Sequence, residues 1–516
     1  MNLRWICVFL GLASAAWPAG AAEPPPGAAA PAAPATNGVL RLTVEQAVLL
    51  ALENHPGLAA ERMNPALLRT FEQEQRAAFD PTLSGDLRHQ DAHTLQLSQS
   101  GTGPLKAKTK TTTGDLALGA QLPSGTGVSL DGSTTDNSLN ARSLSSSRIG
   151  LTVSQALLRG LGTDVNLASL RQARLDTAVS EFEFRGYATA FVAAVEKICY
   201  DYALAGRQIE IYRESVSLAQ RQADETAERI RLGKLAAVEQ AAADAEVALR
   251  REDLIDAESA RAATRLQLLG YLHLAGPDAW SRELAVTPRL ELAEVKPDAL
   301  EDHVRVARRL RPELNQSRLG LQRNELELVK TRNGLLPKLD AFVTWGETGY
   351  ADSFGGSLSA KTDSGRDWQA GLSLEYALGD RQPQARKERA MLTGEQERLA
   401  LDNLGRLVEV DVRSAYVELQ RGLAQTAATL ATRRLQEENV RAETEKFRVG
   451  KSTSLLVARA QRDLVQSEVT EARAVTGCFK ALTDLERLDG SLLARRGIAV
   501  PGADTVPPAP GENDGR

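Results

Sequence analysis

Two short stretches, His55-Pro56-Gly57-Leu58 and Phe79-Asp80-Pro81-Thr82-Leu83, decide the fold because each of them occurs a second time in the chain. Their counterparts are Arg311-Pro312-Glu313-Leu314 and Leu335-Leu336-Pro337-Lys338-Leu339. The offset is 256 residues for both stretches (311 − 55 and 337 − 81). Self-similarity over such a distance indicates one architectural unit that is present twice.

A third repeated stretch marks the end of a long helix in each half. The segment from Glu228 to Lys234 returns from Glu445 to Lys451, at an offset of 217 residues (445 − 228). In the first half it ends a helical pattern that starts near Asn166 and that no proline interrupts. Roughly 70 helical residues would span about 100 Å. Such a helix cannot bury its apolar stripe on itself, so we expect it to pack against other helices as a coiled coil.

Shorter helical patterns flank each long one. Return helices are expected from about Ala237 to Leu269, ending at Gly270, and in the second half up to about Gly490. The helices that precede the strands start at Thr43, a helix start signal, and at Pro297, and prolines kink both of them. Because each short helix is roughly half as long as the long one, two of them stacked end to end would match it.

Between these helices the apolar residues alternate as they do in half-buried strands. In the first half, residues 134–147 are rich in Gly, Ser, Thr and Asn and are expected to form a loop. The residues expected on one face of the strands are Leu116, Leu118, Ala120, Leu122, Ile149, Leu151 and Val153, and in the second half Leu339, Ala341, Val343, Trp345, Trp368, Ala370, Leu372, Leu374 and Tyr376.

The strand-forming region of the first half is the longer one. Pro81 to Gly160 spans 79 positions and Pro337 to Gly379 spans 42, which leaves 37 extra residues (79 − 42). A turn signal from Leu122 to Gly127 lies within this excess. The chain therefore supplies either four or six strands, and the sequence leaves this choice open.

Composition and motifs exclude several classes of function. The net charge is −5 and no basic stripe is present, which argues against a nucleic-acid partner. We find no phosphate-binding loop and no nucleophile motif, so we expect no enzyme activity and no cofactor. His89 and His93 have a metal-ligand spacing only on a helix, and here they fall in a strand-to-loop segment, so we predict no metal site.

The chain ends are expected to lie outside the fold. Residues 1–22 have the pattern of a secretory signal peptide, and residues 23–38 that of a disordered Pro/Ala-rich leader. Cys199 and Cys478 are expected to be buried thiols, and a bridge between them stays open. The folded part is assigned to a first repeat, 39–285, with strands within 82–155, and a second, 286–490, with strands within 338–378; residues 491–516 are assigned to a disordered tail.

Together these elements predict an α+β membrane protein. A secreted chain whose strands have an apolar face, and which has no apolar spanning helix, is typical of a transmembrane β-barrel, because only helices and closed barrels satisfy their backbone groups in lipid. A handful of strands cannot enclose an open lumen, so several chains must contribute. The helices, which are joined to every strand end, would continue the barrel as a tube.

In this order the motifs resemble those of the TolC-type outer-membrane efflux proteins. The resemblance covers about residues 40–490 and implies a homotrimer, with a β-barrel in outer-membrane lipid and a long periplasmic α-helical coiled-coil barrel. It also implies the exit duct of a tripartite efflux or type I secretion system, whose partners are a periplasmic adaptor (membrane fusion) protein and an inner-membrane pump. It is carried by Leu42 to Ala47, Asn54-His55-Pro56, Phe79 to Leu83, Gln155 to Gly160, Tyr376 to Gly379, Gly233 and Gly450.

The resemblance further implies two sites. The family's hairpin tips dock on the adaptor, and its tube is closed beyond the tips by acidic and tyrosine side chains. Glu239 stands at one acidic position, whereas Phe447 replaces the tyrosine and Leu456 and Arg459 replace acids, so a cation-selective constriction does not follow. A solvated helix face is an equal alternative for Glu239. The tip residues that carry over are Arg231, Leu232, Gly233, Lys234, Arg448, Val449, Gly450 and Lys451.

The alternative function from another class is a periplasmic structural or adaptor coiled-coil protein with a soluble β-domain. Such a protein would not need strands with an apolar outer face in both halves. It would not need to repeat its strands either.

Overall fold

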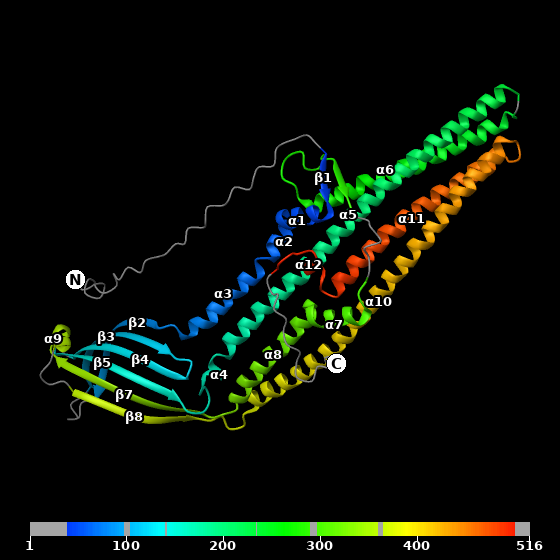
Figure 1. Cartoon of the computed structure of the whole chain (residues 1–516). Helices are drawn as coiled ribbons and strands as arrows, with labels where there is room; N and C mark the ends of the chain where they lie inside the picture. Colours follow the sequence, from blue (N-terminus) through cyan, green and yellow to red (C-terminus); the bar gives the residue numbers. More distant parts are fainter. Residues whose placement is uncertain are drawn as a thin grey trace.

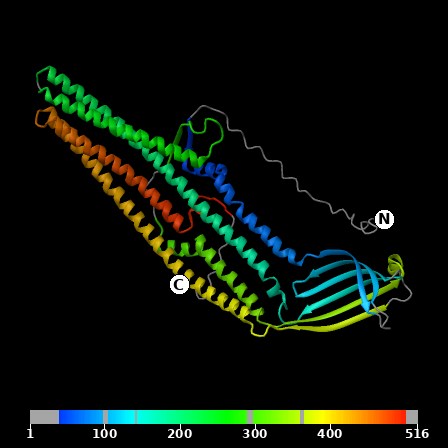
Figure 2. The same cartoon turned by 180° about the vertical axis from the view of Figure 1, so that it is seen from behind.

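The computed structural model describes residues 39–97, 104–139, 142–233, 235–288, 297–359 and 365–500. The expected signal peptide and leader, residues 1–38, lie outside these ranges, as does the last part of the expected tail, residues 501–516. Figure 1 shows a strongly elongated molecule with a β-sheet at one end and two helical hairpins at the other, and Figure 2 shows it from behind.

The first half contains one long helix, its return helix and four of the six strands of the main sheet. In chain order its elements are β1 (Leu40–Thr43), α1 (Val44–Asn54), α2 (Pro56–Glu61), α3 (Asn64–Arg76), a 3-10 turn (Ala77–Phe79), β2 (Thr82–Leu97), β3 (Pro104–Gln121), β4 (Thr126–Leu139), β5 (Arg142–Ala156), α4 (Thr163–Asn166), α5 (Ala168–Arg231), α6 (Val238–Leu272) and β6 (Leu284–Thr287).

The second half repeats this order with fewer strands. Its elements are α7 (Leu300–Leu310), α8 (Pro312–Asn333), β7 (Lys338–Ala351), α9 (Phe354–Ser359), β8 (Gly365–Glu375), α10 (Arg381–Arg448), α11 (Ser454–Leu488) and α12 (Leu492–Arg495).

Helix starts and breaks follow from local chemistry. The side chain of Thr43 accepts a hydrogen bond from the backbone N–H of Gln46, and the Gln46 side chain accepts one from Thr43, which completes a capping box. The prolines break the helices where kinks were expected, because Pro56 and Pro312 each occupy the first position of a new helix. Helix α6 runs past Gly270 to Leu272 and is capped by His273, which adopts the left-handed conformation with φ +44°.

The main sheet is antiparallel throughout, in the order β2-β3-β4-β5-β7-β8. Directly paired residues point to the same face. One row across all six strands is entirely apolar and exposed: Leu83, Leu118, Leu130, Leu151, Trp345 and Trp368. The structure therefore settles the open choice of strand number at six, and it shows the predicted apolar face.

The prediction of a loop over residues 134–147 is wrong. Residues 134–139 belong to β4 and residues 142–147 to β5, so the two strands continue well past the apolar rows. Ser and Thr on adjacent strands satisfy one another there, as when the hydroxyl of Ser147 donates to that of Thr134 at 3.2 Å. His89 and His93, expected in a strand-to-loop segment, both lie within β2 and are exposed.

The helices form a wall one layer thick. Helix α5 contacts α3 and α6 on one flank and α8 and α11 on the other, and α10 contacts α8 and α11 from beyond. Helices α5 and α10 have 64 and 68 residues, whereas α6 and α11 have 35 each. The wall thus has four columns, and two of them consist of shorter helices placed end to end, as the lengths predict (Figure 1).

The end-to-end joints involve the repeated X-Pro motif. In the second half, Arg311 donates to the carbonyl oxygen of Leu488 at the end of α11 (3.3 Å) and to Asp411 of α10 (2.9 Å). In the first half, the ring of His55 lies 6.5 Å from Tyr271 and 6.4 Å from His273 at the end of α6. The duplicated sequence motif therefore marks a duplicated joint.

Two apolar cores hold the wall together near these joints. The first packs α1, α5, α6 and the small β1–β6 pair, and it contains Cys199. The second packs α7, α8, α10 and α11, and it contains Cys478. Both cysteines are buried free thiols, and burial raises the pKa of Cys199 to about 12.

The first ten residues of the expected tail are ordered. In residues 491–500, Leu492 and Leu493 are buried, and Arg496 donates to the buried carboxylate of Glu196 on α5 at 2.6 and 3.1 Å. Arg496 also lies 3.0 Å from Glu486 of α11. The prediction that the fold ends at residue 490 is therefore wrong. Without Arg496, two buried carboxylates would have lost their cation.

Arg496→Ala is expected to lower the free energy of unfolding by about 3 kcal/mol, because Glu196 and Glu486 would stay buried without the guanidinium. The thermal midpoint of the helical circular dichroism signal measures this loss. Arg406→Ala is the matched control, since Arg406 forms an exposed pair with Asp402 and should change stability little.

The loss of stability caused by Arg496→Ala should also depend on pH. Burial raises the pKa of Glu486, and Arg496 opposes this rise. Without Arg496 the pKa of Glu486 rises further, and a carboxyl with a raised pKa in the folded state loses stability as the pH rises through that pKa. The deficit of the variant should therefore be larger at about pH 8 than at about pH 5. A deficit independent of pH would contradict this assignment.

Candidate functional site: the hairpin tips and the two faces of the sheet

The first hairpin tip is the turn between α5 and α6. Arg231 ends α5, the N–H of Leu232 donates to the carbonyl of Glu228 (3.0 Å), and that of Gly233 donates to Ile230 (2.9 Å). Gly233 has φ +70°, a conformation that costs other residues energy. Lys234, the remaining predicted tip residue of this hairpin, lies outside the described residues.

The second tip, between α10 and α11, has the same geometry. The N–H groups of Val449, Gly450 and Lys451 donate to the carbonyls of Glu445 (3.1 Å), Phe447 (3.1 Å) and Lys446 (2.7 Å). Gly450 has φ +74°. The sequence repeat at these two positions is thus a repeat of one helix-ending motif.

The two hairpin tips expose the same kinds of side chain. Leu232 and Val449 are 57% and 65% exposed at the two turns. Arg231 and Arg448 are exposed beside them, and each pairs with a glutamate of its own helix. An apolar residue flanked by a cation therefore stands at each of two neighbouring points at the far end of the molecule (Figure 1).

The predicted constriction residues fall into two groups. The carboxylate of Glu239, in the first turn of α6, accepts a hydrogen bond from the hydroxyl of Ser454 on α11 at 2.6 Å. Phe447 is buried, and the guanidinium of Arg229 on α5 lies 4.5 Å from its ring centroid. These two residues therefore join the two hairpins of one chain, and neither is on a simply solvated face.

Leu456 and Arg459 do not take part in this seam. Both are exposed on α11, and Leu456 lies about 200° around the helix from Ser454. Sequence reasoning missed Ser454 and Arg229. Arg229 belongs to the repeated tip motif and could have been found from it, whereas nothing in the sequence singles out Ser454.

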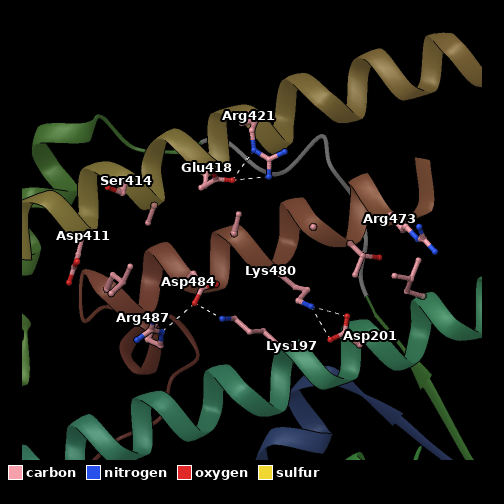
Figure 3. Close-up of a pocket in the computed structure, with 16 residues that line it drawn as sticks. Lys197, Asp201, Asp411, Ser414, Glu418, Arg421, Arg473, Lys480, Asp484 and Arg487 are labelled. Carbon is pink, nitrogen blue, oxygen red and sulfur yellow. Dashed lines mark hydrogen bonds and ion pairs between the residues drawn. The ribbon is translucent and has the colours of Figure 1, made fainter. Parts of the chain in front are cut away.

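A groove of about 720 Å³ lies where α5, α10 and α11 meet. Most of its charged side chains form ion pairs within it: Lys480 binds Asp201 at 2.8 Å, Lys197 binds Asp484, and Arg421 binds Glu418 at 2.8 Å (Figure 3). These pairs are structural bonds between and within helices. The groove therefore offers no assembled nucleophile and base.

The second face of the sheet is polar, in contrast to the apolar row. Its rows alternate with the apolar ones, and one of them reads Thr82, Gly119, Ser129, Thr152, Thr344 and Gln369. On this face Arg148 of β5 passes over Gly346 of β7 and binds Asp367 of β8 at 2.6 Å. A sheet with one apolar and one polar face suits a wall between lipid and water.

Among the helices that the structure describes, none is both long and apolar enough to cross a bilayer. Within the same ranges, no group of three or more His, Cys, Asp and Glu side chains is placed to hold a metal ion.

Comparisons with known proteins agree with this geometry. Residues 303–491 match the family model described as outer membrane efflux protein. The structure is similar to the CmeC outer membrane channel of Campylobacter jejuni (12% identity, 87% of this chain and 86% of that one, TM-score 0.64). It is also similar to the outer membrane protein VceC of Vibrio cholerae (13%, 87% and 96%, 0.62) and the MtrE outer membrane channel of Neisseria gonorrhoeae (17%, 87% and 89%, 0.59). No curated protein sequence matches this chain.

A sheet with one apolar face, continued by a one-layer helical wall, is the fold that this chain shares with these outer-membrane channels. The predicted TolC-type resemblance is confirmed by the family match over residues 303–491 and by the shared fold.

Gly233→Pro and Gly450→Pro are expected to prevent coupling to an adaptor while leaving membrane insertion intact. Proline cannot adopt a positive φ, and it removes the N–H that caps the preceding helix. Cross-linking to the adaptor and the yield of heat-modifiable protein in outer-membrane fractions measure the two properties. Gly276→Pro is the matched control, because Gly276 has φ +112° in a loop that is not part of either tip. Failure of both tip variants to insert would refute the tip assignment.

Proposed function

We propose that three copies of this chain close into one tube, which is the exit duct of a tripartite efflux or type I secretion system. Substrate would pass from an inner-membrane pump and a periplasmic adaptor through the helical part and leave through the barrel. The observation that carries the proposal is that each chain is a one-layer wall with two open flanks.

The two flanks are complementary. On one flank α3 leads into the edge strand β2, and on the other the edge strand β8 leads into α10. Each edge strand has backbone groups that a second strand can pair with. A head-to-tail contact between unlike flanks generates a ring when the rotation closes.

Exposed apolar side chains follow both helical flanks. Met63, which precedes α3 directly, and Leu67 and Phe71 of α3 are spaced four residues apart and are 54% to 63% exposed. On α10 the exposed apolar residues are Met391, Leu392, Leu399, Leu407, Val410 and Val417. Burial of these two stripes against each other would remove both from water.

The alternative, a periplasmic structural protein with a soluble β-domain, fits the sheet poorly. A soluble domain would cover the apolar row, whereas Leu83 and Trp368 are 70% and 75% exposed. Exposure of this row across all six strands favours lipid as its neighbour.

The tips are proposed as the adaptor-docking site, with Arg231, Leu232, Gly233, Lys234, Arg448, Val449, Gly450 and Lys451 as its residues. We propose Glu239, Phe447, Leu456 and Arg459 as residues of the periplasmic narrowing. Glu239 and Phe447 would hold the two hairpins of each chain together. Leu456 and Arg459 would be exposed to the passage.

Phe71→Glu is expected to abolish the trimer, because it places a charge in the apolar contact between α3 and the neighbouring α10. The oligomeric state is measured by mass photometry and by the band of detergent-resistant oligomer on unheated gels. Trp280→Glu is the matched control, since Trp280 is 62% exposed in a loop and not on a flank. A Phe71→Glu protein that remains trimeric would exclude this interface.

Arg459→Glu is expected to shift the reversal potential in a salt gradient toward cations, because it reverses a charge exposed to the passage. Glu239→Gln should change the potential less, since Ser454 already binds that carboxylate. Planar-bilayer recordings provide the measurement. Equal shifts of the reversal potential in the two variants would contradict the proposal that Arg459 faces the passage while Glu239 holds the hairpins together.

A further inference from the structure

We infer that a hollow between α8 and α10, just below the sheet, is an anion-binding site, and that anionic solutes among the cargo of the duct bind there. The inference rests on the proposed function. It names the substrate class as solutes that carry phosphate, sulfate or carboxylate groups. The space is called the arginine hollow, and its basic lining residues are Arg159, Arg323, Lys330, Arg386 and Arg389.

The arginine hollow lies where the helices meet the sheet. Gly334 borders it directly after α8, Gln382 and Pro383 border it at the start of α10, and Arg159 borders it shortly after β5. Its volume of about 670 Å³ is that of a typical small-molecule site. In the proposed duct, a solute passes this level as it moves from the helical part into the barrel.

The lining of the arginine hollow is strongly cationic. Among the described residues that line it, five are basic and two, Glu327 and Glu397, are acidic. An excess of one sign of charge in a concave space focuses the field and raises the local concentration of the opposite ion. The hollow therefore attracts anions.

Three of the five basic residues are not neutralised by a neighbour. Within the described part of the chain, the guanidinium groups of Arg159, Arg386 and Arg389 form no ion pair and no hydrogen bond. The groove shown in Figure 3 is different, because most of its charges are paired within it. The arginine hollow thus keeps its donors available for a ligand.

The two acids do not cancel this charge. Glu327 accepts hydrogen bonds from Gln172 at 3.1 Å and from Lys330 at 3.2 Å, so its partners are outside the group of three unpaired arginines. Burial raises the pKa of Glu397, and Arg323 opposes this rise. A carboxyl with a raised pKa holds its negative charge less firmly than an ordinary one.

The positions of Arg386 and Arg389 are unfavourable while the site is empty. The two residues are three positions apart on one face of α10, and like charges at this spacing repel each other. The first turn of α10 contains no acidic residue that would neutralise them. A bound anion would remove this repulsion.

The arginine hollow and the groove of Figure 3 open on the same side of the wall. Arg386, Thr393, Ser414 and Arg421 of α10 are separated by multiples of seven residues, which places them on one face of a helix in a coiled coil. The first two line the arginine hollow, and the last two line the groove.

This side of the wall is turned away from the β1–β6 pair. Lys197 and Asp201 of α5 line the groove, and each is two residues from Cys199, or about 200° around the helix. Cys199 is buried in the core that contains Leu284 of β6. Since the outer side of a closed tube has more room for added elements than the inner side, the groove and the hollow would line the passage.

Guanidinium groups select a particular kind of anion. Their paired N–H donors match two oxygens of a phosphate, sulfate or carboxylate group. Three chains would arrange three such sites around the passage, and rings of arginine or lysine favour anions in pores. The site would therefore hold an anionic solute at the entrance to the barrel.

Isothermal titration of the purified full-length protein with tripolyphosphate tests the site. We expect the wild type to bind. In the double variant Arg386→Gln and Arg389→Gln the affinity should fall by at least about ten-fold, because two charge-assisted contacts are lost. A wild-type protein that does not bind tripolyphosphate would overturn the inference, whatever the variant does.

The matched control is the double variant Arg398→Gln and Arg406→Gln. It removes the same charge from α10, but from exposed ion pairs with Glu395 and Asp402. Its affinity for tripolyphosphate should stay close to that of the wild type. An equal loss in the control would show a non-specific effect of net charge and would also overturn the site.

A second titration separates a solute from a lipid headgroup as the occupant. Dihexanoyl phosphatidylglycerol carries a phosphate on a short-chain lipid and is used as the competitor. We expect tripolyphosphate to bind more tightly and to displace it. A site that prefers the lipid would overturn the assignment to cargo.

Planar-bilayer recordings connect the site to the passage. Tripolyphosphate, at concentrations that saturate the site, should reduce the wild-type conductance, whereas neutral raffinose at the same concentration should not. A conductance that tripolyphosphate leaves unchanged overturns the anionic cargo and leaves the proposed duct intact. A wild-type protein without conductance refutes the duct, and with it the cargo class, while the titration still decides the anion site.

Discussion

The structure depends on one constraint, the burial of two very long helices in a wall that is one layer thick. Helices α5 and α10 are too long to be covered by a compact core, so they need partners along their whole length. The partners are pairs of shorter helices that meet end to end. The two apolar cores lie near these joints, and contacts between helices close them, such as the bond from Arg311 to Asp411 and the stacking of the His55 and Tyr271 rings.

The same constraint explains why the two halves are similar without being equal. Each half needs one long helix, one return helix and one entry helix, and the repeated motifs specify the breaks and turns between them. The sheet is free of this requirement, because strands can be added in hairpins without changing any helix. The first half uses this freedom. Its extra hairpin, formed by β3 and β4, is inserted with unbroken register between β2 and β5.

Much of this fold could be predicted from the sequence. The glycines at positions 233 and 450 and the prolines at 56 and 312 act through backbone geometry, which is local and readable. The strands of residues 134–147 could not be predicted, because Ser and Thr are polar on both faces there and give no alternation. The contact between Glu239 and Ser454 and the bond from Arg496 to Glu196 were also invisible, since they join residues that are far apart in the chain.

The bond between Arg496 and Glu196 has a consequence for the order of assembly. Glu196 lies near the middle of α5, yet its counter-ion is 300 residues further along the chain. A chain that is still being synthesised therefore holds an unneutralised acid at the heart of its first half until Arg496 has joined the fold. Synthesis of this late segment is thereby coupled to consolidation of the wall, and a chain ended before Arg496 would open locally and be exposed to proteases.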